Sequence, residues 1–403
     1  MKTYIEKGSV PGGILLISGS CIGAGMLALP IITGIAGFGP SIVMFIFSWL
    51  FMTTTGLLLL EANLAVGHDL SLVSIAEKTL GKGGKIICWI FFVFLFYTLS
   101  VAYIAASGEI LQSILFDFIG VQINPWIGSL FFTLVFALFL YFGTRQVDYL
   151  NRLLMGGLVV FYCILIFLGS MYVNIENLKV SYWKYTLPAL PLLIVSFGFH
   201  NMIPSLAMYL NGDRRRLRIT VVLGSTIPLL IYLLWEVVIL GIIPLQGREG
   251  LIQALDQGEV ATQTLRHVVG RSWINSVGQA FALSAIVTSF LAQSLSLLDF
   301  LSDGLKITKV GWRRVSLIFL TLAPPLSFAY IYPGIFIRAL NIGGGFSAVI
   351  LFGIMPALMA WKIQNKNRFL LTIVILIAIS IFTLELAQEL GLSLIPKEIE
   401  VRG

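Results

Sequence analysis

Long apolar segments follow one another along almost the whole chain, and short polar segments separate them. About 20 mainly apolar residues suffice to cross the roughly 30 Å hydrocarbon core of a bilayer. Backbone exposed to lipid must satisfy its own hydrogen bonds, so we expect each segment to be a helix. The pattern predicts an all-α polytopic membrane protein with eleven spans, at about 9–35, 38–63, 86–115, 125–143, 152–173, 186–209, 218–243, 272–299, 314–332, 335–361 and 368–391.

Two of the polar segments between these spans are longer than the rest. Residues 66–85 mix apolar and charged positions, which predicts an amphipathic helix at the cytoplasmic membrane surface. Residues 244–271 are rich in Gln, Glu and Gly, and we expect them to form an external lid or a partly helical cap. Neither segment is typical of a soluble catalytic domain.

The composition also indicates a membrane environment. Hydrophobic residues make up 58% of the 403 residues and charged residues 11%, whereas a soluble domain carries about 25% charged residues. The net charge of +7 predicts no nucleic-acid partner, because the basic residues are spread over short loops. We expect one membrane domain over residues 1–403 in the lipid bilayer, with an uncleaved first span. Cys21, Cys88 and Cys163 all lie in apolar segments, so no disulfide framework is expected.

The lysine and arginine residues predict the orientation of the chain. With a cytoplasmic N-terminus, 18 of the 26 fall in cytoplasmic segments, 7 in external segments, and Arg338 within a span. Cytoplasmic loops carry the excess of basic residues in membrane proteins. We therefore expect the N-terminus to be cytoplasmic and the C-terminus to be external.

Two spans contain residues that interrupt helices. The first span reads SGSCIGAGMLALP over residues 18–30, with three glycines in seven residues and a proline after them. The sixth span reads SFGFHNMIP over residues 196–204, with a glycine, polar residues and a proline. Glycine and proline are both unfavourable in the middle of a helix. Because five spans separate the starts of these segments, the two would be related by inversion, as in transporters built from inverted repeats.

This pattern predicts repeats at about 9–173 and 186–361, with an extra helix at about 368–391. Close packing of helices through small residues is the alternative, but two proline-terminated clusters in matching places favour broken helices. A break near 23–25 would begin a half-helix whose amide N–H groups suit the carboxylate of an amino acid. Freed carbonyl groups near 197–199 would suit its ammonium group, so the two breaks predict a site for a small zwitterion.

At these residues the chain resembles a known family. The runs GAGMLALP (23–30) and LEANL (60–64) resemble the aromatic amino acid permeases of bacteria, within the amino acid–polyamine–organocation superfamily. The resemblance covers essentially the whole chain in length, span count and topology. It implies a five-plus-five inverted repeat and proton-driven import of tyrosine, with tryptophan second, across the bacterial inner membrane. No prosthetic cofactor is implied, and we expect a monomer or a weak oligomer.

The aromatic substrate comes from this family resemblance. Tyr97, Tyr103, Phe197 and Phe199 are candidates for the walls of a ring pocket, although packing between helices is the alternative for each. The predicted substrate site comprises Ser20, Cys21, Gly23, Ala24, Gly25, Tyr97, Tyr103, Phe197, Gly198, Phe199, His200 and Asn201.

Ionisable residues within spans are candidates for ion coupling, because they are costly to place in a membrane. His200 lies in the break of the sixth span, and imidazole titrates near neutral pH. Glu109, Glu236 and Arg338 all fall in the outer third of their helices, so they are candidates for an outer gate or a protonatable cluster. A hydrogen-bonded structural histidine and a static ion pair are the corresponding structural alternatives.

Sodium coupling remains an alternative to proton coupling. Thr288 and Ser289 follow an alanine on the eighth span, as in sodium-coupled transporters of this architecture, and their hydroxyl oxygens suit a hard cation. Hydrogen bonding within or between helices is the structural alternative. In the tenth span, residues 341–347 include three consecutive glycines, which we interpret as a hinge.

A membrane enzyme is the main alternative from another functional class. His68, His200 and His267 would lie on different levels of the membrane, too far apart to share a metal ion. The sequence contains no HExxH motif or nucleophile elbow. A channel is disfavoured because no repeated pore filter is visible. A structural or receptor role remains open from the residues alone.

Overall fold

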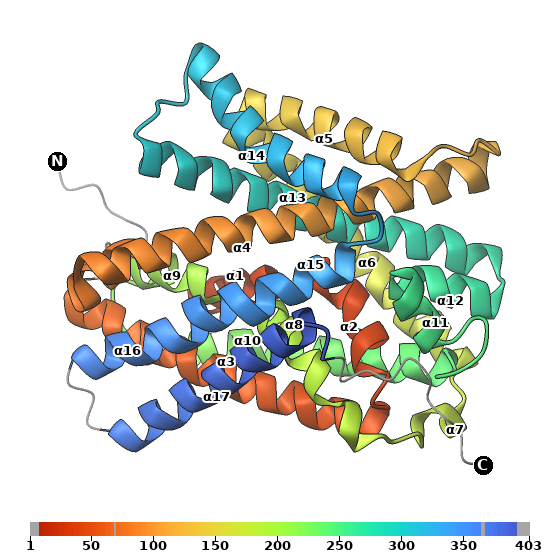
Figure 1. Cartoon of the computed structure of the whole chain (residues 1–403), viewed down its shortest axis with the longest axis horizontal. Coiled ribbons are helices and arrows are strands. Elements are labelled where there is room, and N and C mark those ends of the chain that lie inside the picture. Colours follow the sequence, from red (N-terminus) through yellow and green to blue (C-terminus); the bar gives the residue numbers. More distant parts are fainter. Residues whose placement is uncertain (1–7, 68–69, 364–366, 393–403) are drawn as a thin grey trace.

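The computed structural model describes residues 8–67, 70–363 and 367–392 (Figure 1). Helices make up most of this described part of the chain, which contains no strand. Ten of the helical segments are long and apolar enough to cross a membrane, and a bent pair of shorter helices supplies an eleventh. The predicted all-α polytopic fold is therefore confirmed. His68 and the basic residues of both chain termini lie outside the described residues.

The eleven spans follow the predicted order. In sequence they are α1 (Val10–Cys21) with α2 (Gly25–Thr33), α3 (Phe38–Val66), α4 (Leu72–Ile119), α5 (Pro125–Phe142), α6 (Thr144–Gly169), α8 (Leu190–Ser196) with α9 (Ile203–Tyr209), α10 (Arg214–Ile242), α13 (Ser272–Leu305), α14 (Gly311–Ile331), α15 (Phe336–Ile342) with a π-helical segment (Gly343–Ile354) and α16 (Met355–Lys362), and α17 (Arg368–Glu389).

Local sequence explains where these helices begin and bend. The Ser9 hydroxyl accepts a hydrogen bond from the Gly12 amide and caps α1. The Asp213 carboxylate accepts hydrogen bonds from two amides in the first turn of α10. Gly81, with φ of 77°, bends α4 between residues 72–80 and the long membrane part, so the predicted surface helix is the short first arm of α4.

The helices form two groups that meet along the middle of the molecule (Figure 1). The first two spans pack with α8, α9 and α10, while α5, α13 and α14 gather against α4. Spans one to five and six to ten form the two inverted repeats, and α17 is the additional helix that lies on the π-helical segment.

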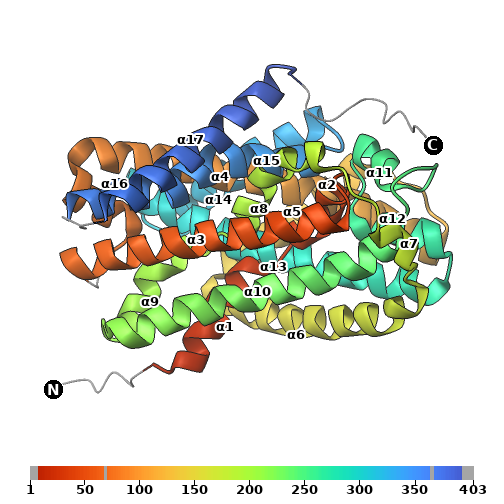
Figure 2. The same ribbon diagram turned by 90° about the horizontal axis from the view of Figure 1, so that it is seen from below.

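The two ends of the bundle differ in their covering. Two short helices of the 244–271 loop, α11 (Leu251–Gln257) and α12 (Ala261–Val269), pack on α2 at one end, here called the α12 end. The loop is therefore largely helical, as expected for a cap. At the opposite end, here called the α9 end, the Gly8 amide donates to the Tyr209 carbonyl (3.2 Å). Figure 2 shows these two ends at opposite sides of the view.

The tenth span differs from its predicted form. The three glycines begin the π-helical segment Gly343–Ile354, so the backbone stays helical there and does not break. A Cβ atom at Gly344 would overlap the Pro191 carbonyl of α8, and one at Gly345 would lie 2.5 Å from the Glu385 side chain. The glycines therefore allow close packing of three spans, and nothing in the structure indicates the predicted hinge.

Candidate functional site

The first span is broken between α1 and α2. The axes of its two half-helices differ in direction by 59°. The Ala24 amide donates to Ser289 Oγ on α13 (2.9 Å). No hydrogen bond joins the Gly23 or Gly25 amide to another described residue. The start of α2 therefore has free amide N–H groups at the positive end of a half-helix.

The sixth span is interrupted at the matching place. Its first half, α8, ends at Ser196, residues 197–199 are non-helical, and a short 3-10 turn (His200–Met202) leads into α9. The segment is less bent than the first span and still passes as one continuous span, Trp183–Tyr209. Both interruptions predicted from glycine and proline positions are therefore present.

A cavity of about 190 Å³ borders both breaks. It is lined by residues of α1, α2, α4, α6, α8 and α13, and Ser20 and Ala292 in its wall are exposed. Ser20, at the end of α1, lies on the α9 side of the first break, and Ala292 lies in the half of α13 nearer the α9 end, so the cavity is open on the α9 side of the breaks. Four buried polar atoms in its wall have no hydrogen-bond partner among the described residues: Asn151 Oδ1, Ser196 Oγ, Asn201 Oδ1 and Gln293 Nε2. These atoms suit a polar ligand, because unsatisfied buried polar groups are costly.

Aromatic rings form another part of the same wall. Phe92 and Phe96 come from α4, and Phe352 comes from the π-helical segment. Their rings contact one another, with centroids 5.6 Å apart for Phe92 and Phe96 and 6.3 Å apart for Phe92 and Phe352. Tyr103 lies further along α4 and also lines the cavity. The cavity therefore combines polar helix ends with an aromatic surface that suits an apolar ring.

The structure brings most of the predicted residues to this cavity. Those that line it are Ser20, Cys21, Gly23, Ala24, Gly25, Tyr103, Gly198 and Asn201 of the predicted substrate site, and Thr288 and Ser289 of the possible cation site.

The other four predicted substrate residues do not line the cavity. The Tyr97 hydroxyl donates to the Leu320 carbonyl of α14 (2.7 Å), on another face of α4. Phe197 and Phe199 are fully buried and do not line this cavity. His200 is also fully buried and lies behind the wall.

His200 is the central ring of a stack. Its ring lies 4.9 Å from that of Phe199 and 4.8 Å from that of Phe352, the latter with an interplanar angle of 14°. Its Nε2 is 2.9 Å from Thr55 Oγ1, and the Thr55 hydroxyl donates to the Met52 carbonyl. The hydroxyl hydrogen is therefore in use, so Nε2–H acts as the donor to Thr55. These contacts describe a buried imidazole that supports Phe352 from behind.

The hydroxyl groups of Thr288 and Ser289 already form hydrogen bonds, which use part of their hydrogen-bonding capacity. The Thr288 hydroxyl donates to the Ser284 carbonyl of its own helix (2.8 Å). Ser289 Oγ accepts from the Ala24 amide, which ties α13 to the first break. A Cβ atom at Gly23 would overlap Ser289 Oγ, so glycine is required for this close approach.

The three gate candidates do not form one cluster. Glu236 on α10 is fully buried and hydrogen-bonds with Thr33 at the end of α2. Arg338 forms an ion pair with Glu389 of α17 (2.5 Å). Glu109 lines a different cavity, of about 420 Å³, beneath α11 and α12. The predicted protonatable cluster is therefore wrong in its membership, and each residue has a separate environment.

One helix, α10, contacts both halves of the broken first span. The Gly224 carbonyl accepts from the Ser18 hydroxyl (2.8 Å), and the Tyr232 hydroxyl donates to the Cys21 carbonyl (2.6 Å). Beyond the break, Trp235 Nε1 donates to the Met26 carbonyl (2.9 Å) and Glu236 meets Thr33. These four contacts, here called the α10 ladder, follow the first span from the last turn of α1 to the end of α2.

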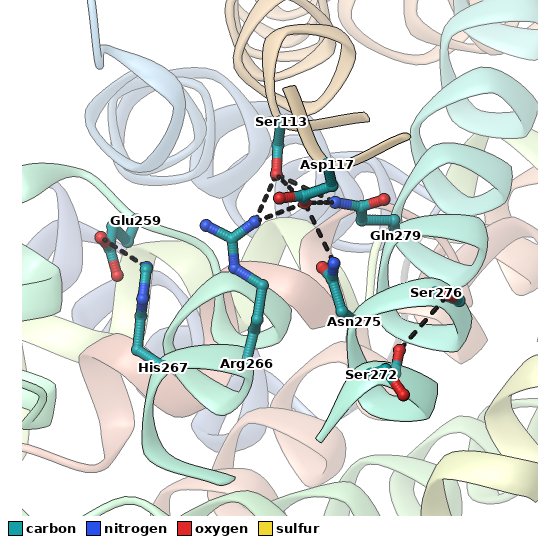
Figure 3. A network of polar contacts seen from close by, with 9 residues as sticks. All are labelled: Ser113, Asp117, Glu259, Arg266, His267, Ser272, Asn275, Ser276 and Gln279. Atoms are coloured by element: carbon teal, nitrogen blue, oxygen red, sulfur yellow. Dashed lines mark hydrogen bonds and ion pairs between the residues drawn. The ribbon is translucent and has the colours of Figure 1, made fainter. Parts of the chain in front are cut away.

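A polar network closes the α12 end (Figure 3). Asp117 near the end of α4 accepts hydrogen bonds from Arg266 of α12 (2.7 Å) and from Asn275 (3.1 Å) and Gln279 (2.5 Å) of α13. Arg266 also donates to Ser113 (2.8 Å). The side chain of Arg266 is 27% exposed and that of Asp117 is 19% exposed, so this is a partly buried charge network that fastens α12 to two spans.

The cavity residues that were not predicted fall into two sets. Phe92 and Phe96 lie at helical spacing from the predicted Tyr103 on one face of α4, and this periodicity is a usable signal. Phe352 and Gln293 have no such signal, because their spans are apolar on several faces and the chain alone does not say which face meets the breaks. Tyr232, with its contact to the first break, was missed for the same reason.

Comparison with known proteins agrees with this geometry. The chain is 32% identical over 374 residues to a tryptophan-specific transport protein of Pseudomonas aeruginosa, covering 91% of this chain and 89% of that protein. It is 33% identical over 365 residues to the tyrosine-specific transport system 1 of Haemophilus influenzae, covering 88% of each. The crystal structure of MhsT in complex with L-phenylalanine has the same fold, with a TM-score of 0.65, 15% identity, and coverage of 93% of this chain and 98% of that one. Residues 6–384 match the tryptophan/tyrosine permease family, so the chain is a multi-pass membrane transport protein that belongs to this family.

Proposed function

We propose that the protein imports an aromatic amino acid, tyrosine first and tryptophan second, together with a proton, by alternating access. The observation that carries this proposal is the single cavity that borders both helix breaks and has free polar groups on one side and phenylalanine rings on the other. The curated relatives named above are tryptophan- and tyrosine-specific, and the structural relative was crystallised with L-phenylalanine.

The two breaks supply complementary charges for a zwitterion. The free amides at the start of α2 suit the carboxylate, because a half-helix N-terminus is electropositive. The carbonyl groups of 197–199 and the unpaired Asn201 Oδ1 suit the ammonium group. Phe92, Phe96 and Phe352 suit the ring, since aromatic side chains pack favourably against one another.

Glu236 is the preferred carrier of the coupling proton. Its Oε1 meets Thr33, its Oε2 has no partner among the described residues, and no cation pairs with it there. The single hydroxyl hydrogen of Thr33 already has an acceptor in the Leu29 carbonyl (2.7 Å), so a proton on the Glu236 carboxyl would supply the second hydrogen bond. Loss of that proton would weaken the contact between α10 and α2, which links protonation to movement of one half-helix.

His200 is the weaker candidate for the proton. A proton on its Nδ1 would have no acceptor, because this atom is buried and without a partner among the described residues. Sodium is the alternative coupling ion. Ser289 Oγ accepts from the Ala24 amide, which leaves this group less free to bind a cation, and this contact favours the proton.

In this proposal the α12 end faces the outside of the cell and the α9 end faces the cytoplasm. The excess of basic residues on cytoplasmic segments supports this orientation. The cavity, open towards the α9 end, then corresponds to a cytoplasm-facing state with the outer side closed by α2, α11 and α12.

The test is uptake of labelled tyrosine into liposomes that contain the purified protein. An imposed pH gradient, acid outside, should drive accumulation without a sodium gradient, and unlabelled tryptophan and phenylalanine should compete while leucine should not. Accumulation that requires sodium would replace the proton with sodium in this proposal. Absence of uptake for every aromatic amino acid would reject the substrate class.

A further inference from the structure

The hydroxyl group of Tyr232 contacts both helix breaks. It donates to the Cys21 carbonyl at the end of α1 (2.6 Å) and to the Ser196 carbonyl at the end of α8 (3.0 Å). Both acceptors are the last residues of their half-helices. One hydroxyl hydrogen therefore lies between two carbonyl groups that the helices themselves leave without a partner.

A pair of converging helix-end carbonyls is an electronegative place. The C-terminal end of each half-helix carries a partial negative charge, and the two ends reinforce each other where they meet. In transporters with broken helices, such carbonyl groups coordinate the coupling cation. Here a neutral donor occupies the space between them, so the hydroxyl hydrogen supplies the positive end that a cation would otherwise supply.

The Tyr232 ring is held so that its hydroxyl has little freedom. The side chain is 1% exposed, and its ring packs 5.3 Å from that of Phe197 and 6.1 Å from that of Phe45. Phe197 itself lies in the second break, directly after Ser196. The helix that carries Tyr232 is also fixed to α1 by Ser18 and to α2 by Trp235. The position of the hydroxyl is therefore determined by packing on several sides.

We propose that Tyr232 is a positioning residue that joins the two helix breaks in place of a monovalent cation, and that removal of its hydroxyl exposes a sodium site between Cys21 and Ser196. The proposal goes beyond proton-coupled import. It rests on the proposed function in one respect, namely that both breaks border the substrate cavity. The latent site takes a small hard cation, because its ligands are carbonyl oxygens.

The test compares Tyr232→Phe with the wild type by thermal unfolding in detergent, in sodium chloride and in choline chloride. The wild type should have the same Tm in both salts. The variant should lose about 1–2 °C in choline, because the Tm shift caused by one lost hydrogen bond becomes smaller as the chain becomes longer, and regain at least half of the loss in sodium. Binding of tyrosine to the variant should be weaker in choline than in sodium.

Tyr162→Phe is the matched control. The Tyr162 hydroxyl donates to one carbonyl, that of Ile231 within α10 (2.8 Å), and touches neither break. Its removal should lower Tm by a similar amount with no difference between the two salts. A Tyr232→Phe variant that behaves in the same way would overturn the proposal, as would a wild type that is stabilised by sodium.

A second variant covers the case in which Tyr232→Phe does not fold. Tyr232→Asn adds an amide oxygen beside the two carbonyl groups, so its Tm should rise with sodium, and a Tm that is independent of sodium would also overturn the proposal. Thermal unfolding requires no substrate. Failure of aromatic uptake would therefore reject the proposed function and leave this result standing.

Discussion

The two ends of the bundle are held by contacts of different kinds. At the α12 end, buried or partly buried polar contacts join α2 to α10 and α12 to α4, through Glu236, Trp235 and Asp117. At the α9 end, the main ion pairs are those of Glu61 with Arg214 and Arg218, whose side chains are 60% and 55% exposed. Exposed pairs contribute little to stability, whereas buried polar contacts are costly to break. For the proposed alternating access, we therefore predict that the α12 end has to be released by a specific event, while the α9 end opens easily.

Among the substitutions that test this contrast between the two ends, Glu236→Gln should have the largest effect. A gradient of one pH unit is worth 1.36 kcal/mol per proton and can drive about tenfold accumulation, and the variant should lose that accumulation because glutamine cannot exchange a proton. Counterflow of labelled against unlabelled tyrosine, which needs no net proton movement, should persist. Liposome uptake measures both.

The matched control for that experiment is Glu385→Gln. Glu385 is a buried carboxyl group of α17 that lies outside the cavity and also has an unpaired Oε2 among the described residues. Its variant should accumulate tyrosine as the wild type does. Full gradient-driven accumulation by Glu236→Gln would remove Glu236 from the coupling role.

Asp117→Asn should loosen the α12 end without touching the cavity. Hydrogen bonds to a charged group are worth about 1.5–3 kcal/mol, so loss of the charge should increase opening of α12 by about tenfold or more. Hydrogen–deuterium exchange of residues 261–269 in lipid nanodiscs is the measurement. Asp148→Asn, which removes an exposed pair with Arg152, should leave that exchange unchanged.

Ser289→Ala should have a moderate effect on substrate affinity. It removes the acceptor of the Ala24 amide and with it a tie between α13 and the first break. One hydrogen bond is worth about 1 kcal/mol, so KM for tyrosine should rise by about fivefold with little change in maximal rate. A loss of sodium-dependent uptake in this variant, with unchanged affinity, would instead assign Ser289 to a cation site.

Glu61→Gln should have the smallest effect. Because its arginine partners are exposed, the two ion pairs at the α9 end together should change uptake by less than about twofold. Initial rates measured at low and high salt test this, since screening should mimic the substitution. A large loss of uptake would mean that the α9 end is held as firmly as the α12 end, and the contrast would fail.

The sequence predicts the spans and both breaks because these features depend on local chemistry. Apolar segments of sufficient length have no other stable environment, and the glycines at 23 and 25 and at 198 cannot support a regular mid-span helix with their neighbours. The residues of the site that come from these breaks, such as Gly25 and Asn201, were therefore found.

Side-chain direction explains which of the predicted residues do not line the cavity. Tyr97 and Tyr103 are six positions apart, so on a helix they point about 120° away from each other and cannot both face one cavity. Phe92, Phe96 and Tyr103 share a face, and Tyr97 does not. Phe199 is aromatic and lies in a break, but its ring faces Gly56, where an added Cβ would lie 2.7 Å away.

The α10 ladder also restricts which changes in length the chain can accept. Its members are Gly224, Tyr232, Trp235 and Glu236, which form hydrogen bonds with residues on both sides of the first break. One residue inserted between 224 and 232 would turn the following side chains by about 100° and advance them by about 1.5 Å, so three of the four partners would be lost at once. The length of this stretch of α10 is therefore fixed. Insertions and deletions are excluded there even where single substitutions are tolerated.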